Sequence, residues 1–223
     1  SSNADNTAAI GRDALAALTS GNSNVAVGAY ALDASTTASN LVGIGRDALG
    51  ANTTGADNTA VGYNAMGANT TGTRNISVGT YSLDSNTEGD RNVSIGWAAM
   101  DANTTGEYNV AVGYAALDAN VTDSNNTAIG YQALSAATAA NNTGLGYQAG
   151  DGLTSGAGNT FLGKEAGDGV TTGSDNVCIG RNVTLATAGT SNGICIGIGI
   201  NAAADDFSFG KASNVVTNDF DTD

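Results

Sequence analysis

The chain has 223 residues, among them 32 glycines but no proline and no histidine. Acidic residues outnumber basic ones by 21 to 7, which gives a formal net charge of −14. This charge argues against nucleic acid or an anionic membrane surface as a partner, because too few cations are present to neutralise phosphates. No apolar run of about 18 residues occurs, so no membrane insertion is expected.

The first residues, Ser-Ser-Asn-Ala-Asp, contain no initiator Met, basic region or apolar stretch. They predict a processed or excised piece without a signal peptide. The low hydrophobicity would be compatible with disorder. The regular order of the sequence argues against that interpretation.

A glycine that follows an aliphatic residue recurs with a period of 17 residues, shortened to 16 once and to 13 at the last step. These glycines are Gly11, Gly28, Gly45, Gly62, Gly79, Gly96, Gly113, Gly130, Gly146, Gly163, Gly180, Gly197 and Gly210. Helical repeats commonly need about 33 residues or more, so this period and its turn-rich stretches predict the coils of a β-solenoid. We expect an all-β solenoid of about twelve 17-residue coils over residues 1–211, followed by a tail or domain junction at 212–223.

Each unit begins with an alternating segment, for example Asn58-Thr59-Ala60-Val61-Gly62. Such alternation predicts a short strand with one face inward. Equivalent positions of successive coils would stack about 4.8 Å apart. The lack of proline fits this arrangement, because every strand would be hydrogen-bonded to a coil on either side.

Two apolar columns follow the glycine: Ala three residues later and, in the first eight units, Leu or Met at the next position. Adjacent side chains of a strand point to opposite faces, so one column would line the coil and the other would face outward. Soluble monomers rarely expose such a stripe, which predicts lateral packing of identical chains. The residues expected in this seam are Leu15, Leu32, Leu49, Met66, Leu83, Met100, Leu117 and Leu134.

The segments 24–28 (Asn-Val-Ala-Val-Gly), 58–62 (Asn-Thr-Ala-Val-Gly) and 109–113 (Asn-Val-Ala-Val-Gly) resemble the repeat of trimeric autotransporter adhesin heads. The fuller form, Asn-Thr-Ala-Val-Gly-Tyr-x-Ala-Leu-x-x-Asn-Thr-Thr-Gly, resembles more closely the repeats of bacteriophage tail-fibre proteins. The resemblance covers most of the chain, although the unit is longer than the adhesin repeat. It implies a left-handed parallel β-roll that assembles as a homotrimer.

The function implied by the resemblance is that of a non-enzymatic fibre segment on a virion, which mediates or spaces host attachment. The alternatives are a bacterial surface adhesin head and, from another class, an ice- or ion-binding β-solenoid. The partner expected beyond the homotrimer is a host receptor or cell-surface glycan.

No Ser-His-Asp set, Cys-His pair or phosphate-binding loop is apparent, so the sequence predicts no enzyme, no cofactor and no metal. Aspartate often stands five residues after the glycine, and Asp84, Asp101 and Asp118 fall on three consecutive coils. Stacked carboxylates are possible Ca²⁺ ligands. Capping of a turn by the Asp side chain is the favoured interpretation, because the same column also accepts Ala16 and Gly50.

Large planar or cationic residues gather one position after the glycine. Stacked aromatic rings stabilise neighbouring strands, and the same rings suit the apolar face of a sugar. Structural stacking is favoured, and glycan binding is kept as the alternative. The candidate receptor-binding residues are Tyr63, Trp97, Tyr114, Tyr131 and Tyr147.

Threonine recurs eight residues after the glycine, as in Thr53 and Thr70. We expect its hydroxyl to bond between stacked turns rather than to form an ice-binding array, because paired threonines are adjacent and cannot share one face.

Cys178 and Cys195 are 17 residues apart and would be neighbours in one column. They are predicted to be free thiols, because parallel in-register side chains give a poor disulfide torsion.

The Leu column ends near Leu134, and Gly150 and Gly167 take the equivalent positions in the next two units. This change predicts that packing between chains alters toward the C-terminus. Phe207 and Phe209 are expected to close the last coil against solvent and edge pairing.

Overall fold

The computed structural model describes residues 6–203, 206–211 and 214–219. Its strands are β1 (Ala8–Ile10), β2 (Val25–Val27), β3 (Val42–Ile44), β4 (Thr59–Val61), β5 (Ile76–Val78), β6 (Val93–Ile95), β7 (Val110–Val112), β8 (Thr127–Ile129), β9 (Thr143–Leu145), β10 (Thr160–Leu162), β11 (Val177–Ile179), β12 (Thr184–Leu185), β13 (Ile194–Ile198), β14 (Asn201–Ala202), β15 (Asp206–Lys211) and β16 (Asn214–Asp219). Over these residues the structure contains no helix, and therefore none that could cross a membrane.

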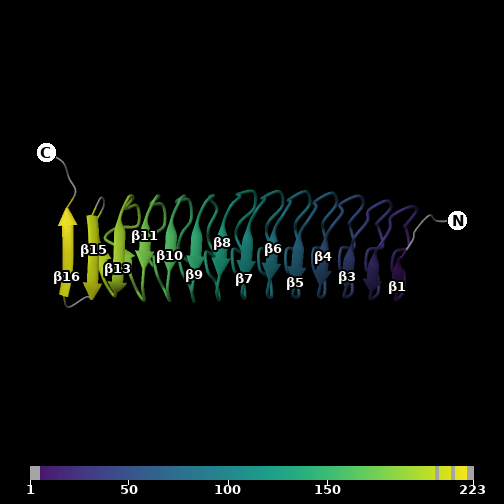
Figure 1. Cartoon of the computed structure of the whole chain (residues 1–223), viewed down its shortest axis with the longest axis horizontal. Helices are drawn as coiled ribbons and strands as arrows, with labels where there is room; N and C mark the ends of the chain where they lie inside the picture. The colour runs from purple at the N-terminus through teal and green to yellow at the C-terminus, as the bar shows by residue number, and fades with distance from the viewer. Residues whose placement is uncertain (1–5, 204–205, 212–213, 220–223) are drawn as a thin grey trace. The chain divides into compact units, whose positions relative to one another are not determined.

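The predicted all-β parallel solenoid of about twelve coils is confirmed. Contacts divide the chain into two units, 1–111 and 112–223, with the division inside β7. In the first unit, β1 to β6 pair in parallel with their sequence neighbours, each in register with the residue 17 positions on (Figure 1). In the second unit, β8, β9, β10, β11, β13 and β15 follow the same rule except for the shorter steps. There β12 and β14 form a small second parallel sheet.

Each three-residue strand turns its middle residue into the coil. Ala26, Ala60 and Ser77 are fully buried, whereas the residues on either side of them are partly exposed. Only a small middle residue fits in the first unit, because a Cβ added to Gly43 would lie 3.0 Å from the Leu32 side chain. The alternation predicted from the sequence is therefore present, with the aliphatic residues outward.

The prediction that the Leu and Met column faces outward as a seam between chains is wrong, because its eight side chains lie inside their own coil. Leu83 is 0% exposed, and the adjacent Ser82 is buried as well. Both residues can point inward because this segment is a turn and not a strand: Tyr81 and Leu83 have φ near +57° and +52°. Strand alternation does not apply to such a left-handed turn. The members of this buried column are Leu15, Leu32, Leu49, Met66, Leu83, Met100, Leu117 and Leu134.

The periodic glycine is required by both its backbone angle and its neighbour on the next coil. Gly62 has φ +142°, and a Cβ built there would lie 2.4 Å from the Gly79 carbonyl oxygen. No other residue type adopts that angle without strain. Because each coil passes so close to the next at this point, the glycine recurs with the period of the fold.

The interior is repacked where the Leu column ends. Phe161 replaces the small middle residue of β10 and is fully buried. Its ring occupies the space beside Gly150 and Gly167, where an added Cβ would lie 2.4 Å from ring carbons. The loss of Leu therefore marks an exchange of one large side chain for another inside the coil, and not the end of a contact between chains.

The last described strand reverses direction. β16 pairs antiparallel with β15, which itself continues the parallel stack (Figure 1). Phe207 and Phe209 do not plug the coil, because they lie on the outward side of β15 and Phe209 is 46% exposed. Of the predicted tail, 214–219 form β16. The rest of that tail and residues 1–5 lie outside the described residues.

Candidate functional site

The main outward apolar surface consists of the residues that flank the middle residue of each strand; we call it the aliphatic face. Ile76 and Ile95 on this face are 44% and 39% exposed. In the first unit it comprises Ala8, Ile10, Val25, Val27, Val42, Ile44, Thr59, Val61, Ile76, Val78, Val93, Ile95 and Val110. In the second unit it comprises Val112, Thr127, Ile129, Thr143, Leu145, Thr160, Leu162, Val177, Ile179, Ile194, Ile196, Phe207 and Phe209. None of these residues is charged, and contiguous apolar surface of this kind marks an interaction site.

The tyrosine column of the second unit forms a stack. The rings of Tyr114 and Tyr131 lie 5.1 Å apart at an interplanar angle of 10°, and those of Tyr131 and Tyr147 lie 5.3 Å apart at 9°. The Lys164 ammonium lies 5.5 Å from the Tyr147 ring centroid. In this stack the ring faces are therefore covered by neighbouring rings and by a cation, and the ring edges are exposed to solvent.

The aromatic residues of the first unit are arranged differently. Tyr63 meets Tyr81 edge to face, with ring centroids 5.3 Å apart at 85°, and the Arg46 guanidinium lies 5.8 Å from the Tyr63 centroid. Trp97 is 48% exposed in the same unit. A sugar stacks on an open ring face, so the stacking interpretation of this column fits the contacts better than the glycan interpretation.

Replacing Tyr131 with serine is expected to lower the free energy of unfolding by about 1–3 kcal/mol, since two stacked pairs are lost at about 0.5–1.5 kcal/mol each. Thermal unfolding followed by circular dichroism measures this change. Tyr108→Ser is the matched control with a smaller expected effect, because the ring and the hydroxyl of Tyr108 both contact the Arg91 guanidinium, and this exposed contact contributes less. Loss of binding on a glycan array with unchanged unfolding would instead make the column a recognition surface.

Of the aspartates five residues after the glycine, Asp84, Asp101 and Asp118 are half-buried in the turns. Asn64 Nδ2 donates a hydrogen bond to Asp84 Oδ1. Burial raises the pKa of Asp84 and the pKa of Asp118 above the ordinary value of 3.8. Among the described residues, no group of three or more Asp, Glu, Cys or His side chains could hold a metal ion. The candidate set Asp84, Asp101 and Asp118 is thus not brought together as a coordination sphere.

These raised pKa values predict a chain that gains stability on mild acidification. The folded state holds protons on Asp84 and Asp118 more readily than the unfolded state, so stability rises as the pH falls from neutral toward 3.8. The net charge of −14 acts in the same direction, because protonation relieves self-repulsion.

The melting temperature is therefore expected to be higher at about pH 4.5 than at pH 7, and Asp84→Asn should flatten this dependence. A melting temperature that is lower at about pH 4.5 than at pH 7 would contradict this expectation. It would show that carboxylates stabilised in their charged form by ion pairs dominate the pH dependence of stability.

The threonine column is used for contacts between turns, as predicted. Thr53 Oγ1 donates to the Thr70 carbonyl oxygen at 3.0 Å, and Thr70 Oγ1 donates to the Thr87 carbonyl oxygen at the same distance. Each hydroxyl thus continues the backbone hydrogen bonding from one coil to the next. These donors are engaged within the chain and do not form an outward array.

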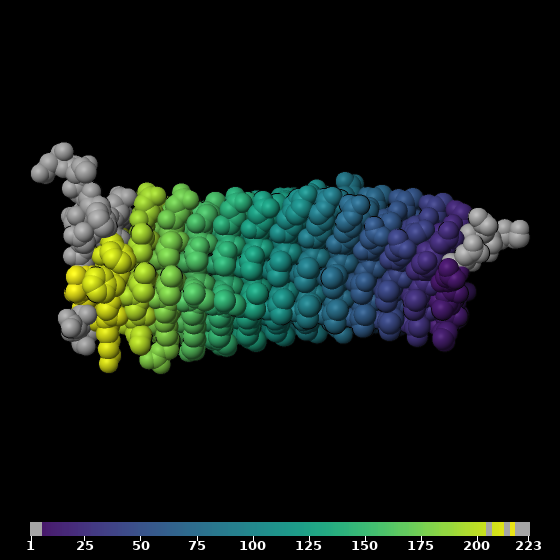
Figure 2. All heavy atoms as spheres, viewed as in Figure 1, coloured from purple at the N-terminus to yellow at the C-terminus, as the bar shows by residue number. Residues whose placement is uncertain are grey.

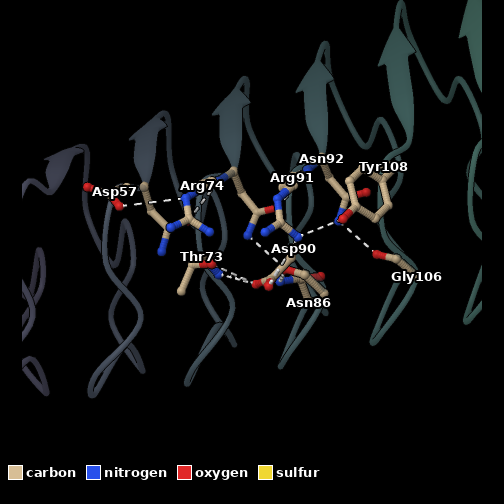
Figure 3. Close-up of polar contacts among 12 residues, drawn as sticks. Asp57, Thr73, Arg74, Asn86, Asp90, Arg91, Asn92, Gly106 and Tyr108 are labelled. Atoms are coloured by element: carbon tan, nitrogen blue, oxygen red, sulfur yellow. Dashed lines mark hydrogen bonds and ion pairs between the residues drawn. The ribbon is translucent and has the colours of Figure 1, made fainter.

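Two buried asparagine ladders were missed from the sequence. In one, Asn86 Nδ2 donates to Asn69 Oδ1 at 2.8 Å, and Asn69 Nδ2 donates to Asn52 Oδ1 at 2.7 Å. In the other, Asn92 Nδ2 donates to the Gly106 carbonyl oxygen at 2.8 Å, and the Asn92 backbone N–H donates to Asn75 Oδ1 (Figure 3). The recurrence of Asn at fixed positions of the repeat was the pattern that could have revealed them.

Charged residues lie at the turn edge of the first unit. The Asp57 carboxylate is 3.9 Å from Arg74 Nε, and Arg91 Nη1 donates to the Tyr108 hydroxyl at 2.9 Å (Figure 3). Thr73 Oγ1 donates to Asp90 Oδ1 at 3.0 Å. The Asp90 carboxylate is 3.9 Å from Arg91 Nη1, so both arginines have an acidic partner, and exposed pairs of this kind contribute little to stability. The edge is therefore no strong anion site.

Cys178 and Cys195 are in-register partners on β11 and β13, and both are buried free thiols, as predicted. Burial raises the pKa of Cys178 to about 12 and that of Cys195 to about 11. The proximity of Cys195 adds to the shift at Cys178. Both thiols are thus neutral at physiological pH, which makes them poor nucleophiles.

Within each unit, side chains of successive coils form rows along the surface, so a contact made by one coil can be repeated by the next (Figure 2). No pocket is present among the described residues. Comparison with protein-family models, with curated proteins and with solved structures finds no match to this chain.

Proposed function

We propose that this chain is a structural segment of a homotrimeric fibre of the bacteriophage tail-fibre type, which spaces or presents a surface for host attachment on a virion. The observation that carries the proposal is the aliphatic face. Its strands recur in every coil, and its outward residues are Val, Ile, Leu and Thr, with Ala8 in β1 and Phe in β15. The left-handed sense of the β-roll and the trimeric order rest on the resemblance of the repeat.

The electrostatics favour a second copy of the same chain as the partner of this face. Two copies that each carry a charge of −14 repel one another over most of their surfaces. The aliphatic face lacks charged side chains, so it is the surface where copies can approach without that repulsion. Burying apolar area contributes about 25 cal/mol per Å², and a repeated row adds this contribution at every coil.

The hydrogen bonds inside the coil support a role as a rigid structural segment. Buried Asn ladders, Thr hydroxyls and backbone ladders join each coil to the next in both units. Polar networks of this kind resist sliding of one coil over another, because each displaced amide would lose its partner. A bacterial surface adhesin head is the second candidate, since such a head would use the same assembled coils on the surface of a bacterial cell instead of a virion.

The test uses a pair of substitutions on the aliphatic face. Ile76→Glu with Ile95→Glu is expected to yield a folded monomer, because both side chains are outward and the new charges repel across the interface. Light scattering measures the mass, and circular dichroism confirms that the coils remain folded. Thr54→Glu with Thr71→Glu is the matched control, since these exposed turn residues lie off the face and the oligomer should persist.

A parent chain that is monomeric at micromolar concentration would overturn the assembly, as would a double Ile variant of unchanged mass. Attachment is tested separately by applying the intact assembly to a glycan array and to bacterial cells. Binding that disappears in the monomeric variant fits attachment strengthened by several copies.

A further inference from the structure

The aliphatic face of the second unit is graded in side-chain size toward the C-terminus. The first outward position of successive strands is Thr in β8, β9 and β10, then Val in β11, Ile in β13 and Phe in β15. The second outward position is Ile or Leu until it becomes Phe209 in β15. The register of β13 with β15 places Ile194 beside Phe207 and Ile196 beside Phe209.

The face of the first unit lacks such a gradient. Its strands β2 to β6 alternate among Val, Ile and Thr without a trend. If two such faces slipped by one coil, about 4.8 Å, each outward residue would meet that of the next coil, and every exchange would be among Val, Ile and Thr. These three side chains are close in size, and an exchange of Val for Ile changes the volume by one methylene, so this part of the face specifies axial register weakly.

A slip in the second unit is different. It would set Phe207 and Phe209 of one chain against Ile194 and Ile196 of another, and leave a phenylalanine pair without its counterpart. Mismatched volumes leave voids, and the lining of a void loses its dispersion contacts. Phe207 and Phe209 also lie 5.6 Å apart in one tilted pair, which presents a single bulky feature and not two separate ones.

We propose that the graded end of the aliphatic face, Ile194, Ile196, Phe207 and Phe209, is the register-setting contact with the same segment of a second copy of this chain. The proposal rests on the homomeric assembly proposed above and adds to it the axial alignment of the copies. The repeated coils supply the contact area, and the graded end selects one alignment among those that a periodic face allows.

The test reads register through single outward cysteines at Thr127, Thr143 and Thr160, which occupy one position on three consecutive coils. Each is replaced by Cys in chains of two tag lengths, the chains are co-assembled, and disulfides are formed with copper-phenanthroline. The natural Cys178 and Cys195 are buried inside the coil and do not interfere. In the parent background, Thr160→Cys should crosslink to Thr160→Cys and not to Thr143→Cys or Thr127→Cys.

The levelled variant Phe207→Thr with Phe209→Val gives β15 outward residues like those of the earlier strands. Crosslinks between Thr160→Cys and Thr143→Cys are expected to rise to a yield comparable with the like-with-like product. Ile194→Thr with Ile196→Val is a second levelled variant, in case the first does not fold. Ile76→Thr with Ile95→Val is the matched control in the first unit and should keep the parental pattern.

The outcomes separate this inference from the proposed function. A monomeric parent overturns the assembly itself. Two outcomes overturn the register role and leave the assembly standing. One is an oligomeric parent that already gives crosslinks between different positions. The other is a folded levelled variant that still crosslinks only between identical positions.

Discussion

Replacing Gly62 with alanine is expected to lower the free energy of unfolding by about 3 kcal/mol or more, because backbone strain and overpacking act together there. Gly62 has φ +142°, and its added Cβ would lie 2.4 Å from the Gly79 carbonyl oxygen. Neither coil can move away without breaking the parallel ladder on both sides. Denaturant titration followed by circular dichroism measures the loss.

Gly50→Ala is the matched control within the same fold. A Cβ at Gly50 would lie 3.4 Å from the Asp47 carbonyl oxygen, near ordinary van der Waals contact. Ala16 occupies the same position in the first 17-residue coil. The expected change in the free energy of unfolding is within about 1 kcal/mol. Its direction is stabilising, because alanine gives the unfolded chain less conformational freedom than glycine does. Equal losses for the two variants would contradict the close approach at Gly62.

Replacing Leu83 with glutamate is expected to unfold the surrounding coils. Leu83 is 0% exposed within its own chain, and burying an unpaired carboxylate there costs several kcal/mol, on the order of 5. Far-UV circular dichroism and light scattering together distinguish unfolding from dissociation. A folded monomer released from an oligomer would show instead that this column faces another chain.

Leu83→Met is the control for that substitution. Met66 and Met100 already occupy the same column and are fully buried. A swap of similar volume is expected to cost less than about 1.5 kcal/mol.

The period of the sequence predicts much of the fold. The 17-residue recurrence of glycine corresponds to the in-register pairing of parallel strands, and the alternation around Ala60 correctly predicts a short strand with one face inward. The Thr53 hydroxyl and the Cys178 thiol also take the predicted roles. These features follow from local residue type and spacing, which a single sequence contains.

The direction of the Leu column could not be predicted in this way. Leu and Tyr disfavour positive φ, yet Tyr81 and Leu83 both adopt it because stacking on the neighbouring coils outweighs the local preference. Hydrogen bonds from the Leu83 and Tyr81 amides to carbonyl groups of adjacent coils accompany this backbone. The sequence also left open whether the tyrosine column stacks or binds a sugar, and the structure adds that Tyr131 uses both ring faces for its neighbours.

The most direct test of the central claim is the mass of the intact chain in solution, measured by sedimentation equilibrium at micromolar concentration and physiological salt. One chain has a mass of 21.8 kDa, and the account predicts the mass of three. Raising the salt concentration should leave the assembly intact, because an uncharged face holds it and screening weakens the repulsion between acidic chains. The mass of one chain under these conditions would contradict the account.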